Sequence, residues 1–570
     1  MQSEIKNCQN CKKDFVIEPE DFNFYEKIKV PPPTWCPECR MIRRMIFRNE
    51  RVFYKDVCSL CGKNIISMYS PNNQLKIYCD KCWWGDGWDE MNYGMEYDWN
   101  TPFFSQWIKL FKQVPLIQAW KFNNINSDYI NYATDDKNCY LSSSILDCEN
   151  VYYSYAVDKS QYIFDSIYSN KSSLCYENID SQNNYNSIFL INCSNCIDSA
   201  LLFDCVNCQN CFLSSNLRNK KYIFKNIQYS KPEYKSKVSE IKTGDFSTLR
   251  KSLSEFTEIK EKKSIHKYIQ VINAIKYLGN NIENSKNIIF SFNIYNAENI
   301  KYSARGANGK DIMDVYGAGD SELVYEGVAP SFKGSNAQFC ITNRASHNIK
   351  YSFLCSASQN LFACIGLRSK SYCILNKQYT KEEYEELVPK IIKHMNDMPY
   401  VDKKGRVYKY GEFFPSELSP FCYNETIAQE YFPLTKEEAF KQGYKWKEKE
   451  ERNYQIDIKN EEIPNDIKEV DDSIINKVIE CEHKGKCNEQ CTEAFKIIPD
   501  ELTFYKRMNL PLPHLCPNCR HYQRLKQRNP LKLWHRKCMK EGCNNEFETS
   551  YAPDRPEIVY CERCYQQEVY

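Results

Sequence analysis

The chain has 570 residues, which at roughly 100–200 residues per domain predicts about three to five domains. Its 76 lysines and arginines nearly balance 74 acidic residues, so the formal charge is +2 and a uniformly basic nucleic-acid-binding protein is excluded. The sequence contains no apolar run near the roughly 18 residues that span a bilayer, and its start lacks the apolar core of a secretory signal. We therefore expect a cytoplasmic protein with no membrane partner.

Cysteine pairs occur at both ends of the chain in the same order and at matching intervals. From the second cysteine of one pair to the first of the next, the interval is 25, then 19, then 18 residues at each end. In a reducing cytosol, dense cysteine indicates metal ligands or buried thiols rather than disulfides. The eight pairs are Cys8/Cys11, Cys36/Cys39, Cys58/Cys61, Cys79/Cys82, Cys487/Cys491, Cys516/Cys519, Cys538/Cys543 and Cys561/Cys564.

Taking neighbouring pairs together predicts four sites of four cysteines each, and hence about four Zn²⁺ ions per chain. A site closed by four cysteines leaves no position for an activated water, so we expect the zinc ions to stabilise small domains rather than to catalyse a reaction. An interleaved pairing within each end stays open. The two wider C-terminal pairs also leave open whether Cys481 or His483 joins the third site.

The first two pairs and their flanking residues resemble the zinc-ribbon domain of bacterial proteins. The resemblance rests on Cys8-x2-Cys11-x3-Phe15, on Phe24-Tyr25-Glu26-Lys27 and on Cys36-Pro37-x-Cys39-Arg40, covers about 35 residues and recurs near 487–520. The wider layout is similar to zinc-ribbon proteins of small-genome bacteria, with a treble-clef-like module at both ends. It implies zinc on those cysteines and no particular activity.

A basic run follows the second cysteine pair at each end. Spacings of three and four residues place the arginines on one side of a helix, where they could contact phosphate groups. The alternative is a helix face that is solvated or paired with acidic residues of the same chain or of a partner. The candidate nucleic-acid-binding residues are Arg40, Arg43, Arg44, Arg48, Arg520, Arg524, Arg528 and Arg536, and RNA or DNA is a candidate partner.

The middle of the chain repeats with a period of 12 residues. Cys139, Val151, Ile163 and Cys175 follow this spacing, which is too short for helical repeats and suits a parallel β-solenoid with a coil of 12 or 24 residues. The two halves end alike, with Ser230/Glu233 and Thr380/Glu383 in the pattern of a helix capping box. We expect a capping helix at the end of each half.

Fourteen cysteines remain outside the four predicted sites. Five of them lie close together in the first repeat, where the same period favours stacked, buried thiols over an extra metal or iron–sulfur site. That alternative is left open for Cys193, Cys196, Cys205, Cys208 and Cys211.

The fold class expected is mixed α+β and multidomain, with a duplicated parallel β-solenoid that has helical caps and is flanked by zinc-ribbon modules at both termini. The expected division has eight parts. These are tandem zinc ribbons at 1–90 and 479–570, a connecting helix at 91–127, solenoid halves at 128–229 and 284–379, a helical cap and insert at 230–283, a helical cap at 380–446 and a charged linker at 447–478.

The function expected is that of a non-enzymatic zinc-binding scaffold or adaptor that contacts nucleic acid or nucleoprotein through the basic helices. Only seven histidines and no tight catalytic grouping are visible in the sequence. Two alternatives stay open. One is a solenoid enzyme acting on polysaccharide, which predicts clustered carboxylates along the coils, and the other is a platform that binds a protein partner on the solenoid face.

Overall fold

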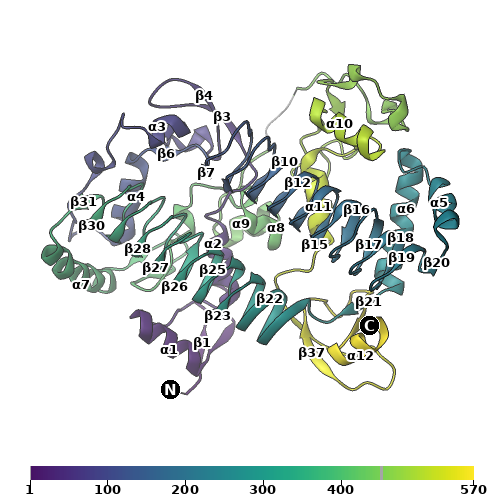
Figure 1. Ribbon diagram of the computed structural model, residues 1–570. Coiled ribbons are helices and arrows are strands. Elements are labelled where there is room, and N and C mark those ends of the chain that lie inside the picture. The colour runs from purple at the N-terminus through teal and green to yellow at the C-terminus, as the bar shows by residue number, and fades with distance from the viewer. Residues whose placement is uncertain (1, 450–452) are drawn as a thin grey trace. The chain divides into compact units, whose positions relative to one another are not determined.

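In the computed structural model, which describes residues 2–449 and 453–570, the chain divides into two compact units (Figure 1). Unit 1 contains Met1–Ala119 and Ile269–Glu448, and unit 2 contains Trp120–Tyr268 and Lys449–Tyr570. Each unit joins the cysteine-rich module of one chain end to a stack of β-strands from the middle of the chain. The division into eight consecutive parts is finer than this and stays a prediction.

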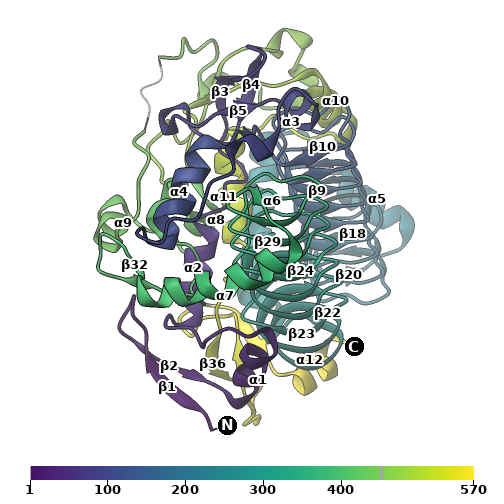
Figure 2. The same ribbon diagram turned by 90° about the vertical axis from the view of Figure 1, so that its left-hand side faces the viewer.

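Each stack consists of parallel strands, seen in Figures 1 and 2 as rows of arrows lying one above the other. In unit 2, Val151 pairs with Ile163 and Ile163 with Cys175, so the partner of each residue lies 12 positions further on. The interval between paired residues is therefore 12 and not 24. We call the strands of unit 2 the first stack. They are β7 (Lys121–Phe122), β8 (Ala133–Thr134), β9 (Ser143–Leu146), β10 (Glu149–Tyr152), β11 (Tyr155–Asp158), β12 (Gln161–Phe164), β13 (Ile167–Asn170), β14 (Ser173–Tyr176), β15 (Ile179–Gln182), β16 (Tyr185–Ile191), β17 (Ala200–Phe203), β18 (Gln209–Ser215), β19 (Lys221–Phe224) and β20 (Ile227–Gln228).

The second stack, in unit 1, has the same register except at one step. Glu322 pairs with Ser335 at an interval of 13, so one extra residue lies between β26 and β27. The strands are β22 (Val271–Tyr295), β23 (Glu298–Lys301), β24 (Ala304–Ala307), β25 (Lys310–Gly319), β26 (Glu322–Val328), β27 (Ser335–Gln338), β28 (His347–Lys350), β29 (Gln359–Phe362), β30 (Ser371–Ile374) and β31 (Lys377–Gln378).

A corner occurs at every third residue of the stacks. The backbone there has positive φ, as at Asn183, Asn186 and Phe189, and asparagine tolerates this conformation better than most residues. Asparagine side chains at equivalent corners also bond to one another along the stack, with Asn126 Nδ2 donating to Asn138 Oδ1 at 2.8 Å. The repeated asparagines of the sequence thus stabilise the corners.

The residue after each corner points into the stack, where the space admits only modest side chains. Isoleucine, leucine, valine and cysteine fill most of these positions, and buried serines bond to the backbone. Ser154 Oγ donates to Tyr152 O at 2.8 Å and accepts from Ser166 N at 3.0 Å. Serines such as Ser154 therefore fill interior positions with their hydrogen bonds satisfied.

Both stacks end in an antiparallel hairpin, β19–β20 or β30–β31, followed by a helix. The helices are α5 (Lys231–Ser239), which contacts β19, and α7 (Lys381–Asp397), which contacts β30 (Figure 1). The predicted capping boxes are present. Ser230 and Glu233 bond reciprocally at the start of α5, as do Thr380 and Glu383 at the start of α7.

The cysteine-rich modules are built from hairpins and short helices. The strands are β1 (Glu4–Asn7), β2 (Asp14–Ile17), β3 (Tyr54–Val57), β4 (Asn64–Ser67), β5 (Ile77–Tyr78), β34 (Ile479–Glu480), β35 (Ala494–Phe495), β36 (Trp534–Lys537), β37 (Glu546–Thr549) and β38 (Ile558–Tyr560). The helices are α1 (Pro19–Ile28), α2 (Pro37–Met45), α3 (Asp80–Trp84), α10 (Pro499–Met508), α11 (Pro517–Lys526) and α12 (Glu562–Val569). In unit 1, β5 pairs with β6 (Leu116–Ile117), and in unit 2, β38 pairs with β21 (Ile265–Lys267).

The remaining helices are α4 (Phe103–Gln113), α6 (Phe246–Glu258), α8 (Ile427–Tyr431) and α9 (Lys436–Gln442), and unit 1 also holds the hairpin of β32 (Tyr400–Val401) and β33 (Val407–Tyr408).

Part of the expected charged linker differs from the prediction. Residues 460–474 contain three 3₁₀ turns whose Ile463, Ile467 and Ile474 are buried in the core beside Leu502. Within the described residues, the helices are all too short or too polar to cross a membrane.

Candidate metal centres and the arginine helices beside them

The structure brings the cysteines at each end together in groups of four, in which all sulfur atoms lie within 4.8 Å of one another. The pairs combine in sequence order, so the interleaved alternative is not what the fold adopts. The groups are Cys8, Cys11, Cys36 and Cys39; Cys58, Cys61, Cys79 and Cys82; Cys481, Cys491, Cys516 and Cys519; and Cys538, Cys543, Cys561 and Cys564. Such groups could hold metal ions.

The sulfur–sulfur distances fit a tetrahedral ion. Bonds of about 2.3 Å from zinc to sulfur place two ligands of a tetrahedron about 3.8 Å apart. Cys11 and Cys36 are 3.7 Å apart, and Cys61 and Cys79 are 3.9 Å apart. The cysteines are therefore spaced as a metal would require.

Two backbone features recur in all four groups. The third cysteine of each group is the N-cap of a helix, α2, α3, α11 or α12, where the free amide ends and the helix dipole favour a thiolate. Its amide also donates to the sulfur of the first cysteine, as from Cys79 N to Cys58 Sγ at 3.3 Å. Burial opposes ionisation of Cys58, but the Cys79 amide helps to lower its pKa to about 6.

The third group corrects one predicted ligand. Cys481, and not Cys487, completes the set with Cys491, Cys516 and Cys519. Cys481 also makes the characteristic contact of a first cysteine, because Cys516 N donates to its sulfur at 3.2 Å. Cys487 instead lies in a second group with His483, Glu489 and Cys519.

The five closely spaced cysteines of the first repeat are interior residues of the first stack. Cys193, Cys196, Cys205, Cys208 and Cys211 are fully buried beside leucines, and among the described residues they form no metal-ligand group. Cys193 Sγ donates to Leu202 O at 3.4 Å, one coil further on. The prediction of stacked, buried thiols is confirmed.

The predicted nucleic-acid-binding face is wrong for seven of its eight residues, because these side chains are buried. The exposed fraction is at most 7% for each of Arg40, Arg43, Arg44, Arg48, Arg520, Arg524 and Arg528. Arg536 is half-buried, and its Nη1 donates to Ala552 O at 3.2 Å. The arginines follow the alternative stated for them, which is pairing with acidic residues of the same chain.

In unit 1, three arginines of α2 meet carboxylates of the second stack. Asp314 forms an ion pair with Arg40 at 2.8 Å and accepts a hydrogen bond from Arg44 at 3.1 Å. Arg43 lies between Glu326, at 2.5 Å, and Glu412, at 2.7 Å. All are buried, and we call this set the unit 1 clamp.

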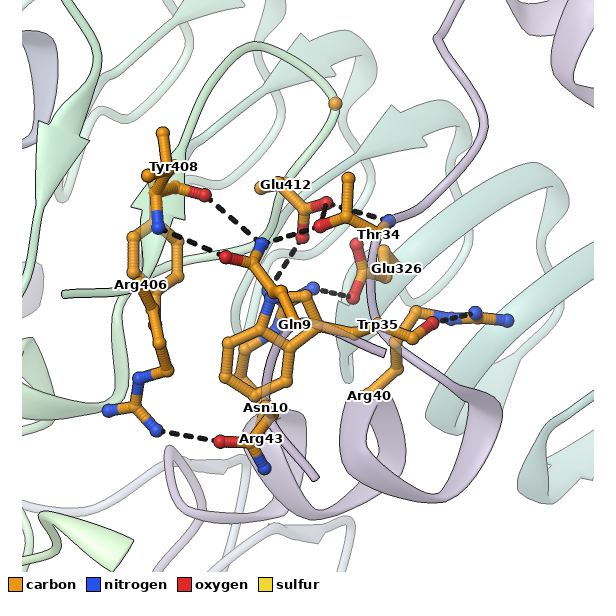
Figure 3. A network of polar contacts seen from close by, with 12 residues as sticks. Gln9, Asn10, Thr34, Trp35, Arg40, Arg43, Glu326, Arg406, Tyr408 and Glu412 are labelled. Atoms are coloured by element: carbon orange, nitrogen blue, oxygen red, sulfur yellow. Dashed lines mark hydrogen bonds and ion pairs between the residues drawn. The ribbon is translucent and has the colours of Figure 1, made fainter. Parts of the chain in front are cut away.

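Polar contacts connect the unit 1 clamp to the loop that carries the first two cysteines, and Figure 3 shows those that join Arg43, Glu412, Thr34 and Gln9. Glu412 also accepts from Thr34 Oγ1 at 2.6 Å, and Thr34 bonds in turn to Gln9, which lies between Cys8 and Cys11. Gln9 further exchanges hydrogen bonds with the backbone of Val407. The metal-ligand loop, the arginine helix and the stack thus share one network.

In unit 2, α11 repeats the arrangement, and we call this set the unit 2 clamp. Asp165 accepts from Arg520 at 2.7 Å and from Arg524 at 2.8 Å, and Arg524 also reaches Glu177 at 2.8 Å. Arg528 contacts both carboxylate oxygens of Asp180, at 2.8 and 2.9 Å.

The two clamps use equivalent positions. Arg40 and Arg44 precede Arg520 and Arg524 by 480 residues, and Asp165 and Glu177 precede Asp314 and Glu326 by 149. In each stack the two carboxylates lie 12 residues apart, hence at equivalent positions of successive repeats about 4.8 Å apart, while arginines four apart on a helix rise about 6 Å. A spacing of 12 between acidic residues, matched to arginines at i and i+4, was the signal that sequence reasoning missed.

Comparison with protein-family models and with curated proteins finds nothing that matches this chain.

Proposed function

We propose that the chain is a non-enzymatic, zinc-stabilised scaffold. In it, zinc-ribbon modules of the treble-clef type at both ends fasten arginine helices onto a duplicated β-solenoid of 12-residue coils. The two clamps carry this proposal. Helix α2 of unit 1 follows its N-cap Cys36, and helix α11 of unit 2 follows its N-cap Cys516. The arginines of both helices form ion pairs with buried carboxylates instead of facing solvent.

The ligands support zinc as the metal. Four thiolates at tetrahedral spacing favour Zn²⁺, which replaces the hydrophobic core that a module of about 40 residues cannot build alone. Four closed groups support structural ions and give no open position for substrate.

The clamps also favour the scaffold over the polysaccharide enzyme. Clustered carboxylates do occur along the stacks, as that alternative requires, but Asp314 and Glu326 are covered by α2, and Asp165 and Glu177 by α11. Carboxylates held in ion pairs and shielded from water cannot reach a sugar chain. We propose a protein as the partner class, since the arginines suited to phosphate are buried.

Metal removal tests the scaffold. A strong chelator should abolish protection of the α2 and α11 amides in hydrogen-exchange mass spectrometry, because the first turn of each helix is fixed by two ligand cysteines. Helix α7, which begins at a capping box, is the control and should stay protected. Protection of α2 that survives complete loss of metal would contradict the proposal.

A binding assay tests the partner class. In 50 mM salt, the full chain should not retard RNA or DNA in a gel. The double variant Arg520→Ala with Arg524→Ala should likewise show no binding as long as it stays folded. Salt-sensitive binding that both substitutions abolish in a folded protein would restore the nucleic-acid hypothesis.

A further inference from the structure

Among the described residues, the third cysteine group has a second cluster of candidate ligands beside it that the other three groups lack. The loop between β34 and β35 spans residues 481–493, whereas the corresponding loop between β1 and β2 spans only 8–13. The longer loop carries His483, Cys487 and Glu489. Their ligand atoms and that of Cys519 all lie within 4.8 Å of one another.

The distances within this second group are those of a tetrahedral site. Cys487 Sγ lies 3.7 Å from Cys519 Sγ, close to the 3.8 Å expected for two sulfurs on one zinc ion. His483 Nδ1 lies 3.2 Å from Glu489 Oε2, close to the roughly 3.4 Å expected for nitrogen and oxygen ligands with bonds of 2.0–2.2 Å.

Two buried atoms in the group have no hydrogen-bond partner. The Glu489 side chain is only 9% exposed, and its Oε2 faces His483 Nδ1 at 3.2 Å, yet neither atom makes a hydrogen bond to the other or to any other described residue. Buried polar atoms are normally satisfied, so a pair left open and turned toward each other and toward two thiols indicates an absent ligand. The other carboxylate oxygen, Oε1, is held by Lys526 Nζ.

We propose that site three is binuclear and that the Cys519 thiolate bridges two divalent ions. The first ion is bound by Cys481, Cys491 and Cys516, and the second by His483, Cys487 and Glu489. A thiolate has more than one lone pair and can bind two cations. The mixed set of two sulfurs, one imidazole and one carboxylate suits Zn²⁺.

Charge balance supports the second ion. Cys487 as a thiolate and Glu489 as a carboxylate add two negative charges, which one divalent cation cancels. Lys526, which contacts Glu489 Oε1, offsets one negative charge, but without the second cation the Cys487 thiolate would add to a group in which four thiolates already surround a single divalent ion. The chain should therefore bind five metal ions, not four.

Elemental analysis of the full, zinc-loaded chain tests this count. We expect five zinc ions per chain in the unchanged protein and four in both Cys487→Ser and Glu489→Gln, with an unchanged circular dichroism spectrum. Cys422→Ser, which alters a half-buried thiol outside every group, is the matched control and should keep five. Four ions in the unchanged protein would overturn the proposal and leave the four-cysteine scaffold intact.

A second measurement needs no variant. In the chain loaded with ¹¹³Cd²⁺, two of five cadmium resonances should be split by mutual coupling through the shared sulfur. Four uncoupled resonances would show that His483 and Glu489 form only an ion pair, and would overturn the bridge.

Discussion

Asp136 is a buried carboxylate in a column of the first stack whose neighbouring members are uncharged. The equivalent positions one coil before and four coils after it are Asn124 and Asn184. Asp136 Oδ1 accepts from Cys148 N at 3.0 Å, but its Oδ2 has no partner. Burial raises the pKa of Asp136 to about 7.

The raised pKa of Asp136 makes the free energy of unfolding depend on pH. Between about pH 4 and 7 the folded chain holds a proton on Asp136 that the unfolded chain releases, so this residue lowers the free energy of unfolding as pH rises through that window. Asp136→Asn should raise the free energy of unfolding of unit 2 by about 1–3 kcal/mol at pH 8 and change it little at pH 4. Urea unfolding at both pH values measures it, and equal effects at the two would refute the assignment.

Arg44 tests the energetics of a clamp. Its guanidinium lies 3.1 Å from Asp314 and 3.7 Å from Glu326, and all three side chains are fully buried. Arg44→Met leaves the two carboxylates poorly compensated and should cost about 3–5 kcal/mol in the free energy of unfolding of unit 1. The control is Lys27→Met. Lys27 pairs with Asp311 at 2.7 Å but is 54% exposed, so its loss should cost about 0–1 kcal/mol. Similar costs for both would contradict the clamp.

Cysteine spacing predicted fifteen of the sixteen cysteines that form the four groups, because each close pair of cysteines is a local structure set by a few residues. It failed at Cys487, because the longer loop carries three cysteines, Cys481, Cys487 and Cys491, and spacing alone does not say which two of them turn toward Cys516 and Cys519. It failed more broadly for the arginines. A basic helix face looks the same in sequence whether its partner is phosphate or a carboxylate from a stack 270 residues away, as for Arg44 and Asp314.

At the scale of elements, the capping boxes show how the stacks end. Thr380 Oγ1 accepts from Glu383 N at 3.2 Å, and Thr380 N donates to Glu383 Oε2 at 2.8 Å. Both bonds satisfy amides that a helix start leaves free. This element was predictable, since the pattern lies within four residues.

Thr380→Ala should therefore destabilise the first turn of α7 by about 1 kcal/mol. Hydrogen exchange of the amides in that turn should accelerate about fivefold, since 1.4 kcal/mol corresponds to a factor of ten. Thr380→Ser keeps the hydroxyl and should exchange like the unchanged chain. If both variants exchange alike, the side-chain bond does not hold the helix.

At the scale of the whole molecule, the arrangement into two units was beyond sequence reasoning. The repeat period predicted two strand stacks and the cysteines predicted two metal modules. No local pattern says, however, that the N-terminal module joins the second stack and the C-terminal module the first. That choice depends on contacts such as Arg43 with Glu326, between residues 283 apart.

The two units predict separate responses to loss of metal. Cys39→Ser should increase hydrogen exchange in α2 and in β25–β26, which α2 contacts, because Cys39 and these elements belong to unit 1. Cys519→Ser should instead loosen α11 in unit 2. Mass-spectrometric exchange of the two variants side by side checks this. Equal loosening of both units by either substitution would show that they unfold as one.

The pairing of α2 with the second stack also determines when this contact can form during translation. Arg44 is synthesised 270 residues before Asp314, the residue with which it pairs. At 5–20 residues per second, the nascent N-terminal module must wait roughly 15–50 seconds for its acidic partner. During that interval its charges are open to any polyanion in the cell, so early zinc capture and protection of the nascent chain would matter most at this stage.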